Sequence, residues 1–308
     1  MRLEELPNEL FFLLFTYLDF ENLYNVFWGL NARLNSLFQS YKHLSFTIDD
    51  KTNQLSIKSF APRITQLIID TSKACDLTEY SNLQSLILCD GDTKHLRQLQ
   101  PNNLPNLRRL SFLLGSKFVP SKELVCGVFS NAFPSLCHVN LGRLQDLTAF
   151  TPTTSPSLRF VSIRCIEPLI VSCILTSCPN LDHLQLHVFQ EIRNHTMSSS
   201  AFNHPLRRLT LWSDSVPLTL TDVDLLLTNT PHVQRFYLQT ITYRPFIDLA
   251  NILVNRLNQL HRFDCHVKEM IKSDRRTVQL STIHRLHWSF DRIECKEKEE
   301  DFCTFITK

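Results

Sequence analysis

A short pattern of apolar and polar positions, apolar-x-x-apolar-x-apolar, returns at intervals along most of the chain. Its last three positions alternate between apolar and polar residues, as in a strand that buries one face. The leading positions of successive copies from Leu83 onward are 22 to 29 residues apart. The copies are Ile64-Leu67-Ile69, Leu83-Leu86-Leu88, Leu107-Leu110-Phe112, Leu136-Val139-Leu141, Leu158-Val161-Ile163, Leu181-Leu184-Leu186, Leu206-Leu209-Leu211, Val233-Phe236-Leu238, Leu260-Phe263-Cys265 and, less regularly, Tyr41-Leu44-Phe46 and Ile283-Leu286-Trp288.

Stretches with the length and composition of helices separate many of these predicted strands, at 124–132, 169–178, 222–230 and 246–260. A proline often stands just before the next strand, where it ends the preceding helix and favours an extended chain. The alternation predicts an α/β fold, with a parallel sheet on one side and helices on the other. A doubly wound α/β domain is the alternative, but it would need longer strands and glycine-rich turns.

The first 41 residues have a different pattern, that of three short helices. Leu10, Leu14 and Leu18 recur every four residues and make one apolar stripe. Asp19 and Asn31 are suitable N-caps for the second and third helices. Three helices of about ten residues cannot bury so many large side chains among themselves. We therefore expect part of this apolar surface to face a protein partner.

Within this segment the motif Leu-Pro-x-Glu-Leu, at residues 6–10, precedes a long apolar run and then Tyr17-Leu18-Asp19. In these features the segment resembles an F-box, a three-helix unit that docks on a small adaptor of the Skp family. The resemblance implies that the adaptor joins the chain to a cullin scaffold and a RING ubiquitin ligase. A capping subdomain of a larger fold is the alternative. The resemblance assigns adaptor binding to Leu6, Pro7, Glu9, Leu10, Phe15 and Leu18.

The repeating part, residues 42–290, resembles a leucine-rich-repeat solenoid of about ten irregular repeats, with the parallel sheet inside its curve and the helices outside. That family often has Asn or Cys three residues beyond the last apolar strand position. This chain instead has Gly91, Gly115, Leu144, Ile166, Phe189, Asp214 and Ile241. Residues 291–308 start with charges and end with Phe302, Phe305 and Ile306, which predicts either a cap whose apolar residues fold back or a frayed tail. The expected parts are therefore 1–41, 42–290 and 291–308.

The composition favours a packed protein without membrane or disulfide chemistry. The chain has 308 residues, 43% of them hydrophobic, and a net charge of +2, which gives no strong attraction to nucleic acid or to a membrane. No apolar run reaches the roughly 18 residues that span a bilayer, and no secretory signal begins the chain. The ten cysteines are scattered without a C-x-x-C pair. We expect a reduced compartment, cytoplasmic or nuclear, with most thiols serving as small apolar groups.

Motifs for catalysis are missing from the sequence, including the phosphate-binding, dinucleotide-binding, serine-hydrolase and zinc-protease motifs. His183 and His187 are four residues apart, but on a predicted strand that spacing separates them by about 13 Å, too far for one zinc ion. His284 and His287 are expected to point to opposite faces. The sequence therefore predicts neither an enzyme nor a cofactor or metal site.

A possible binding surface follows from the strand pattern. The residue just before the central apolar position of each strand should point away from the helices, to the concave side. Arginine is frequent there, and its fork suits carboxylates and phosphates; the alternative is that these arginines only keep the repeat soluble. The column comprises Gln66, Ser85, Arg109, His138, Phe160, His183, Arg208, Arg235, Arg262 and Arg285. With Trp212 and Tyr237 from the neighbouring columns, we assign target binding to Arg109, His183, Arg208, Trp212, Arg235, Tyr237, Arg262 and Arg285.

These observations favour the substrate-recognition subunit of a Skp–cullin–F-box ubiquitin ligase, which binds an adaptor at one end and an acidic or phosphorylated protein target at the other. The alternatives are a ligase-independent binding scaffold, a nucleic-acid binder that uses the arginine column, and an enzyme in its own right. The net charge of +2 and the absence of an aromatic stacking motif disfavour nucleic acid. No residues in the sequence support the hypothesis that the chain is an enzyme.

Overall fold

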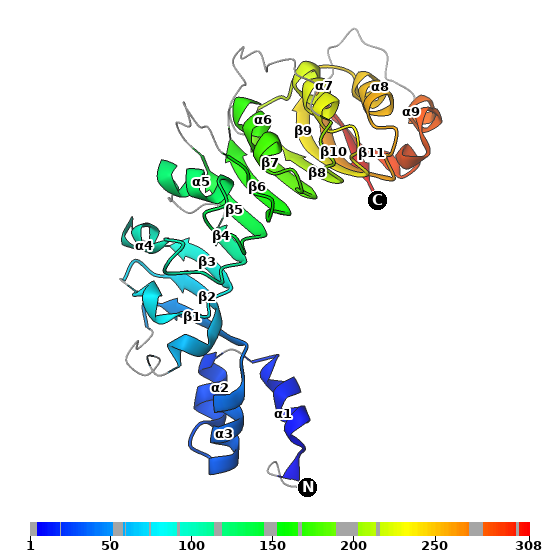
Figure 1. Cartoon of the computed structure of the whole chain (residues 1–308). Helices are drawn as coiled ribbons and strands as arrows, with labels where there is room; N and C mark the ends of the chain where they lie inside the picture. The colour runs from blue at the N-terminus through cyan, green and yellow to red at the C-terminus, as the bar shows by residue number, and fades with distance from the viewer. Residues whose placement is uncertain are drawn as a thin grey trace. The chain divides into compact units, whose positions relative to one another are not determined.

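The computed structural model of this chain has an α/β fold with a mostly parallel arrangement of strands (Figure 1). It separates into two compact units, residues 1–124 with 132–142, and residues 125–131 with 143–308. The predicted cap Asp19 and five of the turn positions, at 91, 115, 166, 189 and 214, lie outside the described residues. The structure describes residues 5–18, 20–51, 58, 60–73, 75–90, 93–113, 119–144, 153–165, 168–188, 203–213, 216–270, 280–299 and 302–308.

The first unit begins with three helices and continues into parallel strands that follow chain order. The predicted cap at Asn31 is confirmed, because its side chain accepts a hydrogen bond from the Leu34 N–H at 2.8 Å. The elements are α1 (Asn8–Phe15), α2 (Phe20–Phe27), α3 (Ala32–Ser40), β1 (Leu44–Asp49), η3 (Ala61–Arg63), β2 (Ile64–Asp70), η4 (Leu77–Glu79), β3 (Ser85–Asp90), α4 (Thr93–Gln98), β4 (Arg109–Phe112), α5 (Lys122–Phe129) and β5 (His138–Arg143), with α5 shared between the two units.

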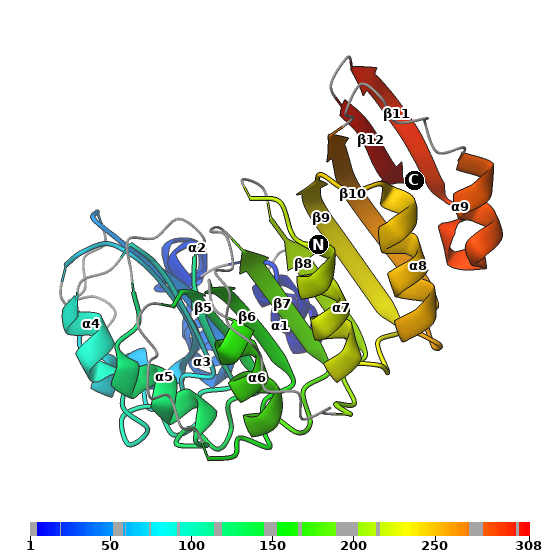
Figure 2. The ribbon, with the colours of Figure 1, turned by 90° about the horizontal axis from the view of Figure 1, so that it is seen from above.

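In the second unit, β6 to β10 are parallel and again follow chain order. Figure 2 shows α6, α7 and α8 following one another along one face of these strands. We call the opposite face of β6–β10 the helix-free face. The elements are β6 (Phe160–Cys165), α6 (Pro168–Ser177), β7 (His183–Val188), β8 (Arg208–Trp212), α7 (Leu220–Asn229), β9 (Arg235–Thr242), α8 (Phe246–Arg256), β10 (Arg262–Met270), α9 (Leu280–Leu286), η5 (Trp288–Phe290), β11 (Ile293–Glu299) and β12 (Phe302–Thr307).

The repeating apolar positions form the core, as the alternation predicted. In the second unit the central positions stack from strand to strand in direct register, and each is at most 1% exposed. This inner ladder consists of Val161, Leu184, Leu209, Phe236 and Phe263. The same alternation holds in the first unit, where Leu67, Leu86 and Leu110 are in register and fully buried. Burying these side chains removes large apolar areas from water, at roughly 25 cal/mol per Å².

The last predicted strand, Ile283-Leu286-Trp288, is wrong. These residues lie in α9 and η5, and Trp288 is largely exposed. Apolar residues three apart fit one turn of a helix as well as the start of this strand pattern, so the sequence alone could not separate the two.

The C-terminal residues form a hairpin. The strand β12 pairs antiparallel with β10, and β11 pairs antiparallel with β12, so the strand order is β10-β12-β11 (Figure 2). Phe305 is buried and its ring stacks on that of Phe246 at a centroid distance of 4.6 Å. The apolar residues at the end of the chain therefore fold back onto the sheet, as one of the two predictions had it, and do not form a frayed tail.

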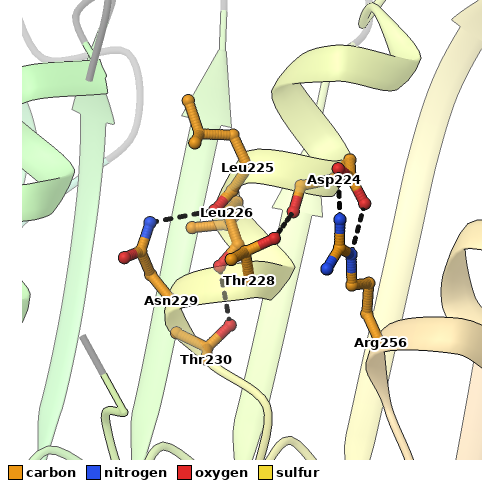
Figure 3. Close-up of polar contacts among 7 residues, drawn as sticks. All are labelled: Asp224, Leu225, Leu226, Thr228, Asn229, Thr230 and Arg256. Atoms are coloured by element: carbon orange, nitrogen blue, oxygen red, sulfur yellow. Dashed lines mark hydrogen bonds and ion pairs between the residues drawn. The ribbon is translucent and has the colours of Figure 1, made fainter. Parts of the chain in front are cut away.

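Side-chain hydrogen bonds to backbone carbonyls mark the end of α7 (Figure 3). The Thr228 hydroxyl donates to the Asp224 carbonyl at 2.7 Å, and the Thr230 hydroxyl donates to the Leu226 carbonyl at 3.0 Å. Arg256 at the end of α8 donates two hydrogen bonds to the Asp224 carboxylate, at 2.6 and 2.9 Å. A two-pronged contact of this kind fixes the orientation of both partners, so it aligns the last turn of α8 with α7.

The inner ladder yields a direct test of the strand register. We expect Leu184→Asp to lower the free energy of unfolding by about 3–5 kcal/mol, because it leaves an uncompensated charge in the core. Gln185 is the next residue on β7 and points to the helix-free face. Gln185→Asp should therefore change the free energy of unfolding by less than about 1 kcal/mol. Urea denaturation of both variants measures the difference, and equal effects would contradict the assigned register.

A buried histidine adds a pH dependence to the second unit. His204 is buried, its Nε2 lies 2.9 Å from the Cys178 carbonyl oxygen, and its Nδ1 is buried without a hydrogen-bond partner among the described residues. Burial lowers the pKa of His204, with a smaller opposing effect from the Cys178 carbonyl.

Because the folded-state pKa of His204 lies below the unfolded value near 6.5, the unfolded state binds the proton more readily. The neutral ring therefore contributes its stability at neutral pH, and that contribution is lost as the pH falls below about 6.5. We expect the unfolding free energy to decline more steeply between about pH 7 and pH 5 in the unmodified chain than in His204→Gln. Parallel slopes in denaturation at several pH values would exclude this role.

Candidate binding surfaces

The first candidate surface lies on α1, which is apolar on both faces. Phe11 and Phe15 point into the three-helix core and are buried. The other face of the helix carries three large side chains that remain in contact with solvent, and a fourth lies in the turn just after α1. They are Leu10 (43% exposed), Leu13 (53%), Leu14 (41%) and Tyr17 (80%). We call these four residues the α1 surface. Exposed apolar groups at this density are typical of an interaction site.

The structure corrects one predicted contact residue. Phe15 is only 1% exposed and packs within the helices, with ring centroids 5.3 Å from Phe27 and 6.4 Å from Phe38. It therefore shapes the core beneath the α1 surface and does not reach a partner itself. The sequence could not reveal this, because Phe15 belongs to an apolar run in which every residue looks equally suited to either face.

The other five predicted adaptor contacts lie in or around α1. Pro7, Glu9 and Leu10 are exposed, while Leu6 and Leu18 are half-buried. Arg33, which the sequence did not single out, donates to the Leu6 carbonyl and to the Asn8 Oδ1, both at 2.6 Å. These hydrogen bonds hold the start of α1 against α3.

An aromatic cluster joins the three helices to the first strand. The Phe20 ring lies 5.4 Å from that of Phe46 on β1 and 5.2 Å from that of Phe60. Phe60 also contacts Trp28 at 5.1 Å and Phe38 at 5.2 Å. Because these rings pack in the core of the first unit, the helices and the strand are continuous within it. The α1 surface is therefore presented from a fixed base in the first unit.

The second candidate surface lies on the helix-free face of the second unit. Arg208, Arg235 and Arg262 occupy equivalent positions on β8, β9 and β10, and each is paired in register with the next. All three side chains are exposed. We call them the arginine ladder. Adjacent strands are about 4.8 Å apart, and like charges at that distance repel one another by about 1 kcal/mol in water. An anion lying across the ladder would relieve that repulsion.

Two aspartates partly balance the ladder. Arg208 lies 3.7 Å from Asp182. Asp264 pairs with Arg262 and also, at 3.6 Å, with Arg292, the residue before β11. Within the described part of the chain, Arg235 has no ion-pair partner. The surface therefore keeps an excess of positive charge, with Arg235 at its centre. Asp264 lies two residues after Arg262 on β10, whereas the approach of Asp182 to Arg208 depends on which strands pair.

A row of aromatic and polar side chains runs beside the ladder. The ring centroids of His187 and Trp212 are 4.1 Å apart, and Trp212 and Tyr237 are 6.0 Å apart in a T-shaped arrangement. The Tyr237 hydroxyl donates to Gln239 Oε1 at 2.9 Å. The indole Nε1 of Trp212 is buried without a hydrogen-bond partner among the described residues. This row can contact the apolar parts of a ligand that the arginines bind by charge.

His183 is less accessible than predicted. Its Nε2 lies 3.1 Å from the Thr210 hydroxyl oxygen, and its ring packs edge-on against Phe160 at 4.9 Å. His183 therefore packs against its neighbours on the helix-free face, which limits its contact with a ligand.

No group of three or more His, Cys, Asp or Glu side chains arranged to hold a metal ion occurs in the described ranges.

The remaining two predicted contacts differ from the ladder. Arg109 lies on β4 in the first unit, exposed and in register with His138 on β5. Burial, and then the Arg109 charge, lower the pKa of His138. Arg285 does not lie on a strand at all. It is an exposed residue of α9, because the repeat that predicted its position forms a helix.

A cavity of about 800 Å³ lies between the start of α7 and α8 in the second unit. Its charged lining residues, Asp222, Arg244 and Asp248, have opposite signs and do not favour one kind of ligand. We therefore regard the α1 surface and the arginine ladder as the two candidate sites.

Comparison with protein-family models finds no match to this chain, and comparison with curated proteins finds no similar sequence. Over the residues that the structure describes, no helix is both long enough and apolar enough to cross a membrane.

Proposed function

We propose that this chain is the substrate-recognition subunit of a Skp–cullin–F-box ubiquitin ligase. In this proposal the N-terminal helices act as an F-box that binds a Skp-family adaptor, and the strands and helices that follow act as a leucine-rich-repeat solenoid that binds a target protein. The chain itself performs no chemistry. It holds the target near the ubiquitin-charged enzyme, so that lysines of the target experience a high effective concentration.

The single observation that carries the proposal is the α1 surface, which begins at Leu10, the last residue of the Leu-Pro-x-Glu-Leu motif. The helices have already buried Phe11, Phe15 and Phe27 in their own core and Phe20 against β1. Leu10, Leu13, Leu14 and Tyr17 therefore have no further part of the helical core to cover them. A partner protein with an apolar docking surface would complete this packing.

The strand register supports the repeat assignment. Each apolar-x-x-apolar-x-apolar copy from Ile64 to Cys265 coincides with a strand whose central residue is buried. In a repeat protein, neighbouring units contact mainly each other and present an extended surface for binding. The arginine ladder lies on such a surface.

In this proposal the α1 surface contributes a measurable part of the affinity for the adaptor. Leu10→Ala combined with Leu14→Ala removes two partly exposed leucines, each contributing about 1 kcal/mol when covered. We expect the dissociation constant for a purified Skp-family adaptor to rise about thirtyfold, as measured by calorimetry.

Leu113→Ala is the matched control, because Leu113 is 46% exposed but lies on no predicted adaptor surface. It should leave adaptor affinity unchanged. If the double variant binds as tightly as the unmodified chain, the F-box assignment is wrong. Binding of adaptor and target without ubiquitylation in a reconstituted reaction would instead identify a ligase-independent scaffold.

The arginine ladder favours an extended acidic or phosphorylated segment of the target. Three adjacent strands span roughly 10 Å, and an extended peptide rises about 3.3 Å per residue. Three or four residues can therefore lie along the ladder with carboxylates or phosphates beside the guanidinium groups. Exposed single pairs contribute about 1 kcal/mol or less, so useful affinity requires several pairs together with the aromatic row at Trp212 and Tyr237.

We test this with a fluorescent hexaglutamate peptide and a phosphoserine peptide of equal length. Arg208→Ala with Arg235→Ala should weaken binding about tenfold or more, and raising the salt concentration to physiological strength should weaken it further. Arg207→Ala with Arg244→Ala removes the same charge from other exposed positions of the second unit and should have little effect. If both double variants lose the same peptide affinity, the loss comes from the total positive charge of the second unit and not from the ladder. Tighter binding of single-stranded RNA than of either peptide would favour the nucleic-acid alternative.

A further inference from the structure

Two cysteines meet on neighbouring strands of the C-terminal hairpin. Cys295 lies on β11 and Cys303 on β12, and their Sγ atoms are 2.7 Å apart. A disulfide bond is about 2.0 Å long, so only a small further approach separates this contact from a covalent bond. Cys295 is exposed, whereas Cys303 is buried. A reagent in solution can therefore reach Cys295, and the Cys303 sulfur lies beside the Cys295 sulfur.

The hairpin register explains how the two side chains meet. Cys295 is directly opposite Phe305, and Cys303 is opposite Lys298, so the two cysteines face each other diagonally. The register shifts between Cys295 and Glu297. A bulge of this kind increases the local twist and changes the direction of the side chains next to it. In this hairpin the neighbouring side chain, Cys295, reaches across to Cys303.

Three other cysteines, Cys75, Cys178 and Cys265, are buried. Burial raises the pKa of Cys75 to about 11 and that of Cys178 to about 12, and it raises the pKa of Cys265 as well. A raised pKa keeps these three thiols protonated at neutral pH, and a protonated thiol is a poor nucleophile. They behave as small apolar groups, in contrast to the exposed Cys295.

We propose that Cys295 and Cys303 are a redox-active pair that forms an intramolecular disulfide by exchange with a low-molecular-weight disulfide such as oxidised glutathione. The Cys295 thiolate attacks one sulfur of the reagent, forms a mixed disulfide and releases one glutathione thiolate. The Cys303 thiolate then attacks the Cys295 sulfur, which closes the protein disulfide and releases the second glutathione. The two protein thiols are oxidised, one disulfide reagent is reduced, and the two thiol protons pass to the two glutathione molecules.

The bond would join β11 covalently to β12. Since β12 pairs with β10, it would also tie the outermost strand to the rest of the second unit. Arg292, which contacts Asp264 beside the arginine ladder, lies just before β11. Oxidation would therefore restrict the segment that contributes one of the charges around the ladder.

The experiment treats the reduced full-length chain with oxidised glutathione and maps tryptic peptides without reduction. Lys296 and Lys298 lie between the two cysteines, so trypsin separates them and the disulfide appears as peptide 293–296 linked to peptide 299–308. We expect this linked species to dominate the oxidised product. Cys295→Ser should abolish it, and Cys137→Ser, which removes a thiol just before β5 in the first unit, should leave it unchanged.

Hydrogen exchange of the same samples provides a second measurement. Amides of β11 and β12 should exchange more slowly in the oxidised chain than in the reduced chain, and Cys295→Ser should show no such change. Two results would overturn the proposal. One is a stable mixed disulfide on Cys295 without the linked peptides, and the other is linkage of Cys295 to other cysteines in comparable yield.

Discussion

The structure depends on one constraint, the in-register stacking of apolar side chains between neighbouring parallel strands. In the second unit Val161, Leu184, Leu209, Phe236 and Phe263 stack on the helix-covered side. Because side chains alternate along a strand, the same register also aligns the residues that point the other way. The arginine ladder is thus a geometric consequence of the core: the pairing that buries the leucines also places three guanidinium groups side by side.

In the first unit, packing of aromatic rings has the corresponding role. Phe60 lies among Phe20, Trp28 and Phe38, so the helices and the first strand share one core. With Phe11 and Phe15 used inside that core, the opposite face of α1 remains uncovered. Both candidate surfaces therefore consist of the side chains that the interior cannot accommodate, apolar on α1 and basic on the strands.

Local patterns in the sequence predicted most of the elements. The apolar positions of the repeats, the cap at Asn31 and the surplus of apolar side chains on the first helix were evident from the sequence, but not which of those side chains the helix buries. The errors have a common cause, which is contact between distant segments. The burial of Phe15, the clamp by Arg33, the pairing of Asp264 with Arg292 and the helix that contains Arg285 all depend on which segments meet, and neither composition nor periodicity encodes that choice.

The strand order β10-β12-β11 has a consequence for synthesis of the chain. The ribosome makes β11 before β12, yet β12 is the strand that connects β11 to β10. Until β12 emerges, the open edge of β10 and the whole of β11 have unpaired backbone groups, and such edges invite pairing with other chains. The charged residues of β11 discourage that pairing during translation, before β12 has been synthesised. They are Glu294, Lys296, Glu297, Lys298 and Glu299.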